Sequence, residues 1–155
     1  MKSILSIFVA ILSLLGLNHT TATPPGAFTD PAYGFSLQLP TNFSVYPANS
    51  SELATDTVRI LVFESPQQQH VVQLMIVPFS GTLDKETAEQ EPPLPTTTPL
   101  TLPLGDPALS FTASGVFGTD TNNVWFVHAG YLFEMMSAGS DESLLYSIAQ
   151  SIRFN

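Results

Sequence analysis

Strict alternation of apolar and polar residues near the start of the chain constrains its fold more than any other feature. Residues 32–46 read AYGFSLQLPTNFSVY, and the apolar side chains recur at every second position up to Leu39. This period of two is typical of a half-buried β-strand. Pro40 ends the run because it has no N–H to donate to a β-ladder. Alternation then resumes over 43–46, so the pattern predicts a β-hairpin with its turn at Thr41-Asn42.

Two longer apolar segments predict the centre of a β-sheet. They are TVRILVFE at 57–64 and HVVQLMIVPF at 70–79, and SPQQQ between them is typical of a hairpin connection. Both are apolar at nearly every position, which is the composition of strands that are covered on both faces. We therefore expect these two strands to be central, with other structure packed on each side.

The last third of the chain continues the sheet. Three segments have strand composition: ALSFTAS at 108–114, VWFVH at 124–128 and YLFEMM at 131–136. Val116-Phe117 follows the first of them, and the polar GTDTNN at 118–123 then predicts a turn. Ala129-Gly130 predicts a tight two-residue hairpin, because glycine adopts positive φ without steric cost.

Helical spacing predicts a C-terminal helix as a main part of the core. Ser140 is a suitable N-cap, and two acidic residues follow it in the first turn, where the helix dipole favours negative charge. The apolar stripe of this helix consists of Leu144, Leu145, Ile148 and Ile152. A weaker helix is predicted over 82–90, where only Leu83 and Ala88 are available for burial.

A proline-rich segment interrupts the pattern of strands. Residues 91–107 contain six prolines among threonines and leucines, a composition that favours extended backbone. A linker between domains is one interpretation. We prefer a surface crossover within one domain, because few residues follow Pro107 to build a second core. The predicted fold is α+β: a single antiparallel sheet of about six to seven strands, covered by the C-terminal helix, with the 82–90 helix as a second covering element.

The first residues resemble a targeting segment. Lys2 precedes the largely apolar run Ile4–Leu17, which would span roughly 21 Å as a helix and is short for a membrane of about 30 Å. This is the pattern of a secretory signal peptide over residues 1–22, cleaved after Ala22. An uncleaved anchor is the alternative. We predict an exported protein, periplasmic or extracellular, whose single domain spans 23–155.

Composition excludes several classes of function. The chain has no cysteine, which excludes disulfides, thiolate nucleophiles, cysteine-bound zinc and a lipid anchor on cysteine. All 13 acidic residues but only three basic ones follow Ala22, so the exported portion carries a net charge of −10. Because nucleic acids and anionic membrane surfaces are bound through clustered Lys and Arg, neither is an expected partner.

Three segments together resemble the PsbP-like superfamily. They are YGFSLQLPTNFSV near the start, VWFVHAGYLFEM late in the chain and SIAQSIRF at the end. The namesake is the extrinsic subunit of the oxygen-evolving photosystem, and the same fold occurs in a small nuclear-import factor that binds the Ran GTPase. The resemblance implies an antiparallel sheet between helices and a largely non-enzymatic role in binding or assembly. The region after Phe79 is shorter and richer in proline than in the larger members.

Candidate catalytic or metal-binding residues are few. His70 starts one predicted strand and His128 enters a hairpin, and no G-x-S-x-G motif accompanies a serine. Both histidines are therefore interpreted as residues at strand ends. Asp120-Thr121-Asn122 resembles the start of a calcium loop but lacks its glycine and distal glutamate, so a polar turn is the preferred interpretation.

Glu134 is the acid with the strongest claim to function. It lies between Phe133 and Met135 on a predicted strand, and a glutamate inside a core has a raised pKa. Alternation, however, places Glu134 on the face opposite Tyr131, Phe133 and Met135, so exposure to solvent is the preferred interpretation.

The function that these observations favour is an exported, non-catalytic module that binds a protein or envelope component. No catalytic, cofactor-binding or metal-binding residue is assigned, no cofactor is expected, and the pattern leaves the oligomeric state open. The alternative is a small-ligand carrier or weak hydrolase with an apolar pocket near Trp125 and Tyr131. Phe126 and Phe133 could also line that pocket, although core packing is the preferred interpretation of all four aromatic residues.

Overall fold

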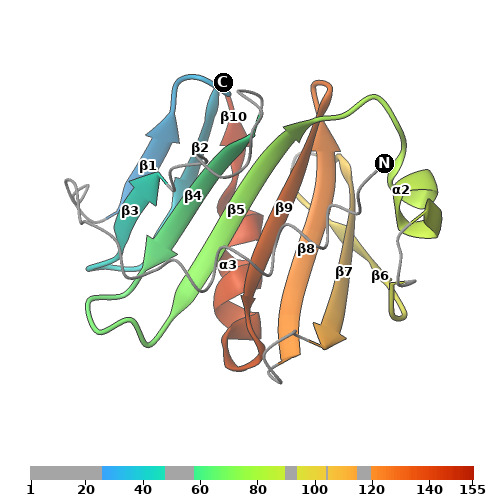
Figure 1. Ribbon diagram of the computed structural model, residues 1–155. Helices are drawn as coiled ribbons and strands as arrows, with labels where there is room; N and C mark the ends of the chain where they lie inside the picture. The colour runs from blue at the N-terminus through green and yellow to red at the C-terminus, as the bar shows by residue number, and fades with distance from the viewer. Residues whose placement is uncertain (1–25, 48–57, 90–93, 104, 115–119) are drawn as a thin grey trace.

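A computed structural model describes residues 26–47, 58–89, 94–103, 105–114 and 120–155. Within these ranges the chain forms a seven-stranded antiparallel sheet in the order β3-β4-β5-β9-β8-β7-β6 and a three-stranded sheet in the order β1-β2-β10 (Figure 1). The strands are β1 (Ala27–Asp30), β2 (Phe35–Gln38), β3 (Ser44–Pro47), β4 (Arg59–Glu64), β5 (Val71–Pro78), β6 (Thr98–Thr101), β7 (Pro107–Ser114), β8 (Asp120–His128), β9 (Tyr131–Ala138) and β10 (Arg153–Phe154). The helices are α2 (Leu83–Glu89), the 3-10 turn η2 (Gly139–Asp141) and α3 (Glu142–Ser151). The α+β class and the seven-stranded sheet are confirmed.

The two continuous apolar segments form β4 and β5, as predicted. They pair as an antiparallel hairpin, and β5 and β9 lie side by side at the centre of the sheet (Figure 1). Successive residues of a strand point to opposite faces of a sheet. One face, which we call the α3 face, carries the cross-strand row Leu61, Leu74 and Met135. The opposite face, which we call the α2 face, carries the neighbouring row Ile60, Met75, Glu134 and Trp125.

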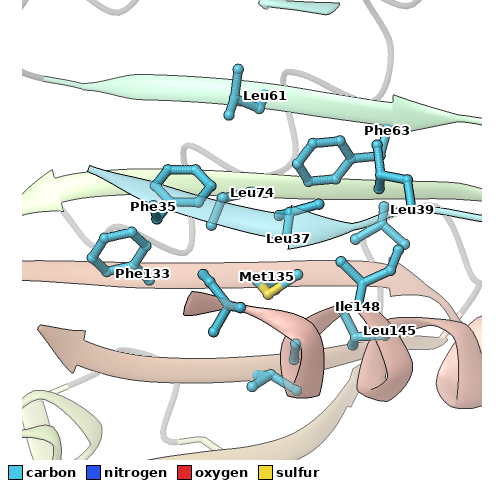
Figure 2. Packing of buried hydrophobic residues seen from close by; sticks show 14 of the residues in the cluster. Phe35, Leu37, Leu39, Leu61, Phe63, Leu74, Phe133, Met135, Leu145 and Ile148 are labelled. Atoms are coloured by element: carbon cyan, nitrogen blue, oxygen red, sulfur yellow. The ribbon is translucent and has the colours of Figure 1, made fainter. Parts of the chain in front are cut away.

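The α3 face holds the larger hydrophobic core. Figure 2 shows residues of α3, β2 and the central strands packed together in this core. Leu145, Ile148 and Ile152 are fully buried there, while Leu144 is only partly buried. The predicted apolar stripe is therefore confirmed. Burial of each such side chain stabilises the folded state by about 1.5–3 kcal/mol before conformational entropy is subtracted.

The start of α3 differs from the prediction. Ser140 lies inside η2, so Asp141 and not Ser140 precedes the first residue of the helix, and no side chain caps it. The Ser140 hydroxyl donates instead to the Asp141 carboxylate at 3.3 Å. A tight 3-10 turn therefore replaces the predicted N-cap, which is common at helix ends.

The predicted opening hairpin is wrong. The turn exists, with the Phe43 amide donating to the Pro40 carbonyl at 3.3 Å. However, β2 pairs with β1 and β10 in the small sheet, whereas β3 pairs with β4 in the large one. Both ladder edges of β2 are thus occupied by strands that sequence patterning did not identify. This arrangement places Phe35 over the α3 face, where its ring lies 5.9 Å from that of Phe133.

The polar segment before VWFVH is strand, not turn. β8 begins at Asp120, so the predicted turn over 118–123 is wrong for its described part. Asn122 and Asn123 are buried, and their side-chain amides donate to backbone carbonyls, the closest being those of Gly139 at 3.0 Å and Thr121 at 3.1 Å. These polar residues can be buried within a strand because their side-chain amides are hydrogen-bonded. Val116 and Phe117 lie outside the described residues.

The proline-rich segment contributes an edge strand. β6 pairs with β7 and is the last strand of the large sheet in the described part of the chain. Prolines are tolerated at a sheet edge, where one row of backbone groups has no ladder partner. This strand was not predicted, although the extended backbone of the segment was.

The weaker predicted helix is present as α2. The Thr82 hydroxyl accepts a hydrogen bond from the Lys85 amide at 3.4 Å, which caps the start of the helix. Leu83 is buried as expected, but Ala88 is exposed and Glu86 is buried in its place. Leu83 packs with Trp125 and Leu132 of the α2 face.

The turn at Ala129-Gly130 is confirmed. His128 pairs with Tyr131 across it, and both central residues have positive φ, 49° and 83°. This backbone is that of a type I′ turn, whose twist matches the flanking strands.

The predicted targeting segment over residues 1–22 lies outside the described residues. Among the residues that are described, no helix is long and apolar enough to cross a membrane.

Candidate binding cavity

Two connections meet at one end of the large sheet. The β4–β5 turn and the β9–η2–α3 connection both lie at the lower end in Figure 1. The turn is closed by hydrogen bonds from the Ser65 amide to the His70 carbonyl (3.0 Å) and from the Gln68 amide to the Ser65 carbonyl (2.9 Å). These bonds close the hairpin loop on itself, and a contact of 2.8 Å between His70 Nδ1 and Asp141 Oδ1 joins the loop to the start of α3.

A cavity of about 300 Å³ opens at this end. The described residues that line it are Val62, Glu64, Gln68, Gln69, Val71, Gln73, Met136, Ser137, Ala138 and Asp141. Val62, Gln73 and Met136 form one cross-strand row of the α2 face, so the floor is mostly apolar. An apolar floor with a few placed polar groups is typical of small-ligand sites, and the volume is at the lower end of their range.

Two polar atoms at this cavity have no partner. Gln73 Nε2 and Asp141 Oδ2 are buried and make no hydrogen bond. Gln73 is 4% exposed and Asp141 is 3% exposed. An unsatisfied buried donor or acceptor costs about 1–3 kcal/mol, and more when it is charged. The cavity therefore presents one hydrogen-bond donor and one carboxylate oxygen that a bound group could satisfy.

The carboxylate of Asp141 is held in place from its other side. His70 Nδ1 lies 2.8 Å from Asp141 Oδ1, and the Ser140 hydroxyl donates to the same oxygen. The His70 side chain is half exposed. Because Oδ1 is occupied by these two groups, Oδ2 is the oxygen left for a ligand.

A metal centre is not formed by the described side chains. No group of three or more His, Asp or Glu residues lies close enough, within the described ranges, to hold a metal ion. The cavity instead contains the carboxylates of Glu64 and Asp141 and the amide of Gln73.

The two histidines lie far apart, at opposite ends of the large sheet. His70 immediately precedes β5, whereas His128 ends β8 at the opposite end of the sheet. His128 Nδ1 lies 2.7 Å from Asp106 Oδ2, and its ring stacks on Phe154 with 3.6 Å between centroids. The interpretation of both histidines as residues at strand ends is confirmed, and His70 has the additional contact with Asp141.

Glu134 does not face solvent. Its side chain is completely buried on the α2 face, and neither carboxylate oxygen has a hydrogen-bond partner. Burial raises the pKa of Glu134 well above its usual value, and the nearby Glu86 raises it further. Glu134 lies one cross-strand row away from Gln73 and does not line the cavity.

Trp125 and Tyr131, which were predicted to lie near one pocket, do not share one in the described part of the chain. Trp125 lies on the α2 face opposite Glu134, whereas Tyr131 packs at the α3 face, so the sheet separates them. Trp125 packs edge-on against Phe111 at 5.1 Å, and Phe126 stacks on Phe133 at 4.8 Å. Core packing, the other interpretation, explains Trp125, Phe126 and Phe133.

Sequence reasoning missed the cavity residues. Gln73 carried a signal, since it is the only polar residue between Val71 and Val77. Asp141 was assigned to the first turn of the C-terminal helix, and Glu64 to the end of a strand. Their approach to one another depends on the β5–β9 pairing, which local patterns do not contain.

Comparisons with known proteins identify the fold. No protein-family model and no curated protein sequence matches the chain. The solution structure of cyanobacterial PsbP (CyanoP) from Synechocystis sp. PCC 6803 is similar, with a TM-score of 0.58, 12% identity, and coverage of 92% of this chain and 99% of that one. A crystal structure from Bacteroides thetaiotaomicron VPI-5482 has a TM-score of 0.54 and 11% identity over 86% of this chain, which spans about half (49%) of that protein. The chain therefore has a PsbP-like fold, as its motifs suggested.

Proposed function

We propose that this chain is an exported, non-catalytic module that binds a protein or an envelope component, and that the cavity between the β4–β5 turn and α3 is its point of contact. The PsbP-like fold supports a role as an accessory protein. The unpartnered atoms of Gln73 and Asp141 carry the proposal, because buried polar groups are nearly always hydrogen-bonded in folded proteins.

Export is part of the proposal and is supported by the first residues. The apolar run Ile4–Leu17 after Lys2 has the length and flanks of a signal peptide. The absence of cysteine leaves such a protein without disulfides, so its stability rests on the packed α3 face.

A small-ligand carrier is the second candidate. The observation that favours it is the cavity volume of about 300 Å³, which lies at the lower end of the range for small-ligand sites. This candidate uses the same cavity, and not the pocket near Trp125 that the sequence suggested.

Site-specific photo-cross-linking tests the proposed function. A photoreactive residue at Gln69, on the cavity lining, is compared with one at Thr87 on α2, away from the cavity. In intact cells that make the protein, we expect one discrete adduct from position 69 and none from position 87. Equal adducts from both positions, or none from position 69, would contradict the proposal.

A further inference from the structure

We propose that the cavity binds a primary ammonium group carried next to a hydrogen-bond acceptor such as a carbonyl oxygen. This inference rests on the proposed function and adds the chemistry of the bound group. Three described side chains carry it: Glu64 and Asp141 supply negative charge, and Gln73 supplies an unpartnered donor.

The charges of the lining favour a cation. Among the described lining residues, two are acidic and none is Lys or Arg. An anionic ligand would lie against the unpartnered Asp141 Oδ2 and would be repelled. An ammonium group gains charge-assisted hydrogen bonds to the same carboxylates.

The unpartnered donor adds a second requirement. Gln73 Nε2 needs an acceptor, which an alkylammonium ion alone does not provide. Gln73 lies on the floor of the cavity, in the same cross-strand row as Val62 and Met136. A ligand that binds both the carboxylates and the Gln73 donor therefore combines an ammonium group with an adjacent carbonyl or hydroxyl oxygen.

This chemistry has two sources. One is a free amino compound small enough for a cavity of about 300 Å³. The other is the amino terminus of a partner chain, in which the α-ammonium group lies next to the first peptide carbonyl. The two share the contacts described above and differ in what lies outside the cavity mouth.

Nuclear magnetic resonance titration of the purified protein tests the inference. The probes are glycinamide, which has both groups; ethylammonium, which lacks the acceptor; N-acetylglycinamide, which lacks the charge; and acetate, an anion. We expect shifts of the side-chain amide of Gln73 and of the backbone amides of 64–73 and 136–141 with glycinamide, weaker shifts with ethylammonium, and none with the other two. Equal shifts with acetate or N-acetylglycinamide, or no shift with glycinamide, would overturn the inference.

Substitutions of the lining residues test which side chains contact the bound glycinamide. Asp141→Asn and Glu64→Gln should each weaken glycinamide binding by about tenfold or more, because each removes one charged partner. Glu64→Gln leaves the His70–Asp141 contact intact, so it serves if Asp141→Asn fails to fold. Glu142→Gln is the matched control, since Glu142 is exposed and outside the lining.

Gln73→Leu should remove the preference for glycinamide over ethylammonium. Unchanged affinity in both acidic variants would overturn the inference.

A final pair of probes separates the two sources. Triglycine amide and its N-acetylated form differ only in the terminal ammonium group. If a partner's amino terminus is the ligand, the free peptide should bind at least as tightly as glycinamide, and the acetylated peptide should not bind. If a free amino compound is the ligand, the peptide should bind more weakly than glycinamide. A cross-link from Gln69 without any binding of ammonium probes would reject this inference and leave the proposed function standing.

Discussion

Glu134 lies between Met75 and Trp125 in the register of the central strands, surrounded by the buried side chains of the α2 face. Neither of its carboxylate oxygens has a hydrogen-bond partner, and Nε1 of Trp125 also lacks one. Desolvation of the carboxylate disfavours its charged form, and the neighbouring Glu86 adds repulsion. At pH values between the usual pKa of this group and its raised pKa, the folded protein therefore retains a proton that the unfolded chain releases.

The raised pKa of Glu134 predicts a specific dependence of stability on pH. Well below the usual pKa of 4.5 the group is protonated in both states, so it adds no pH dependence to the free energy of unfolding. Above it only the unfolded chain loses the proton, so the free energy of unfolding falls, by up to about 1.4 kcal/mol per pH unit, until the folded group also ionises. Glu134→Gln should abolish this component, and its stability advantage over the wild type should grow as pH rises above about 4.5.

Chemical denaturation at a series of pH values measures this difference. Glu89→Gln, at an exposed glutamate of α2, is the control and should follow the wild-type profile. Parallel profiles for the wild type and Glu134→Gln would show that this carboxyl group does not titrate differently in the folded state.

Sequence patterning placed Glu134 and Gln73 in strands but singled out only Glu134, for which it favoured exposure to solvent. Alternation shows which residues of a strand point to the same face of the sheet. It does not show whether other structure covers that face. The continuous apolar composition of 70–79 was the better guide, since it predicted cover on both faces.

At the scale of elements, strand positions were predictable and several pairings were not. β4, β5, β9 and the end of β8 follow from composition, and the Ala129-Gly130 turn fixes the β8–β9 pairing locally. β2 was predicted to pair with β3 because the two strands are neighbours in sequence. Its actual partners are β1, whose sequence AFTD does not alternate, and β10, whose two residues are too few for a period to be detected.

The turn between β8 and β9 permits a paired test of backbone strain. Ala129 has a φ of 49°, a conformation that alanine rarely adopts, so Ala129→Asn should stabilise the fold by about 0.5–1 kcal/mol. Gly130 has a φ of 83° and open space around its Cα, so Gly130→Ala should destabilise by about 1–2 kcal/mol through φ alone. Thermal unfolding of the two variants measures both effects. The same sign of change in both would contradict a type I′ turn here.

For the molecule as a whole, α3 and the large sheet depend on each other. Leu145 is completely buried against the α3 face, while Trp125, the only tryptophan, lies on the α2 face. If residues 23–155 form one domain, a change on one face must alter the unfolding of the other.

Leu145→Ala should lower the free energy of unfolding by about 2–5 kcal/mol, because it leaves a cavity in the core. Trp125 fluorescence and far-ultraviolet circular dichroism should report the same shifted midpoint. Leu144→Ala, at the partly buried neighbour, should have a smaller effect. A Trp125 transition that stays at the wild-type midpoint would contradict a single domain.

Hydrogen-exchange footprinting tests most directly the claim that the protein acts by binding at the end of the sheet where the β4–β5 turn meets α3. The full chain is compared alone and with envelope extract of the cells that make it, and the β6–β7 edge at 98–110 serves as the internal reference. The proposed function predicts slower exchange for amides of residues 64–73 and 136–141 and unchanged exchange at the reference edge. Protection confined to 98–110, or no protection in either region, would contradict it.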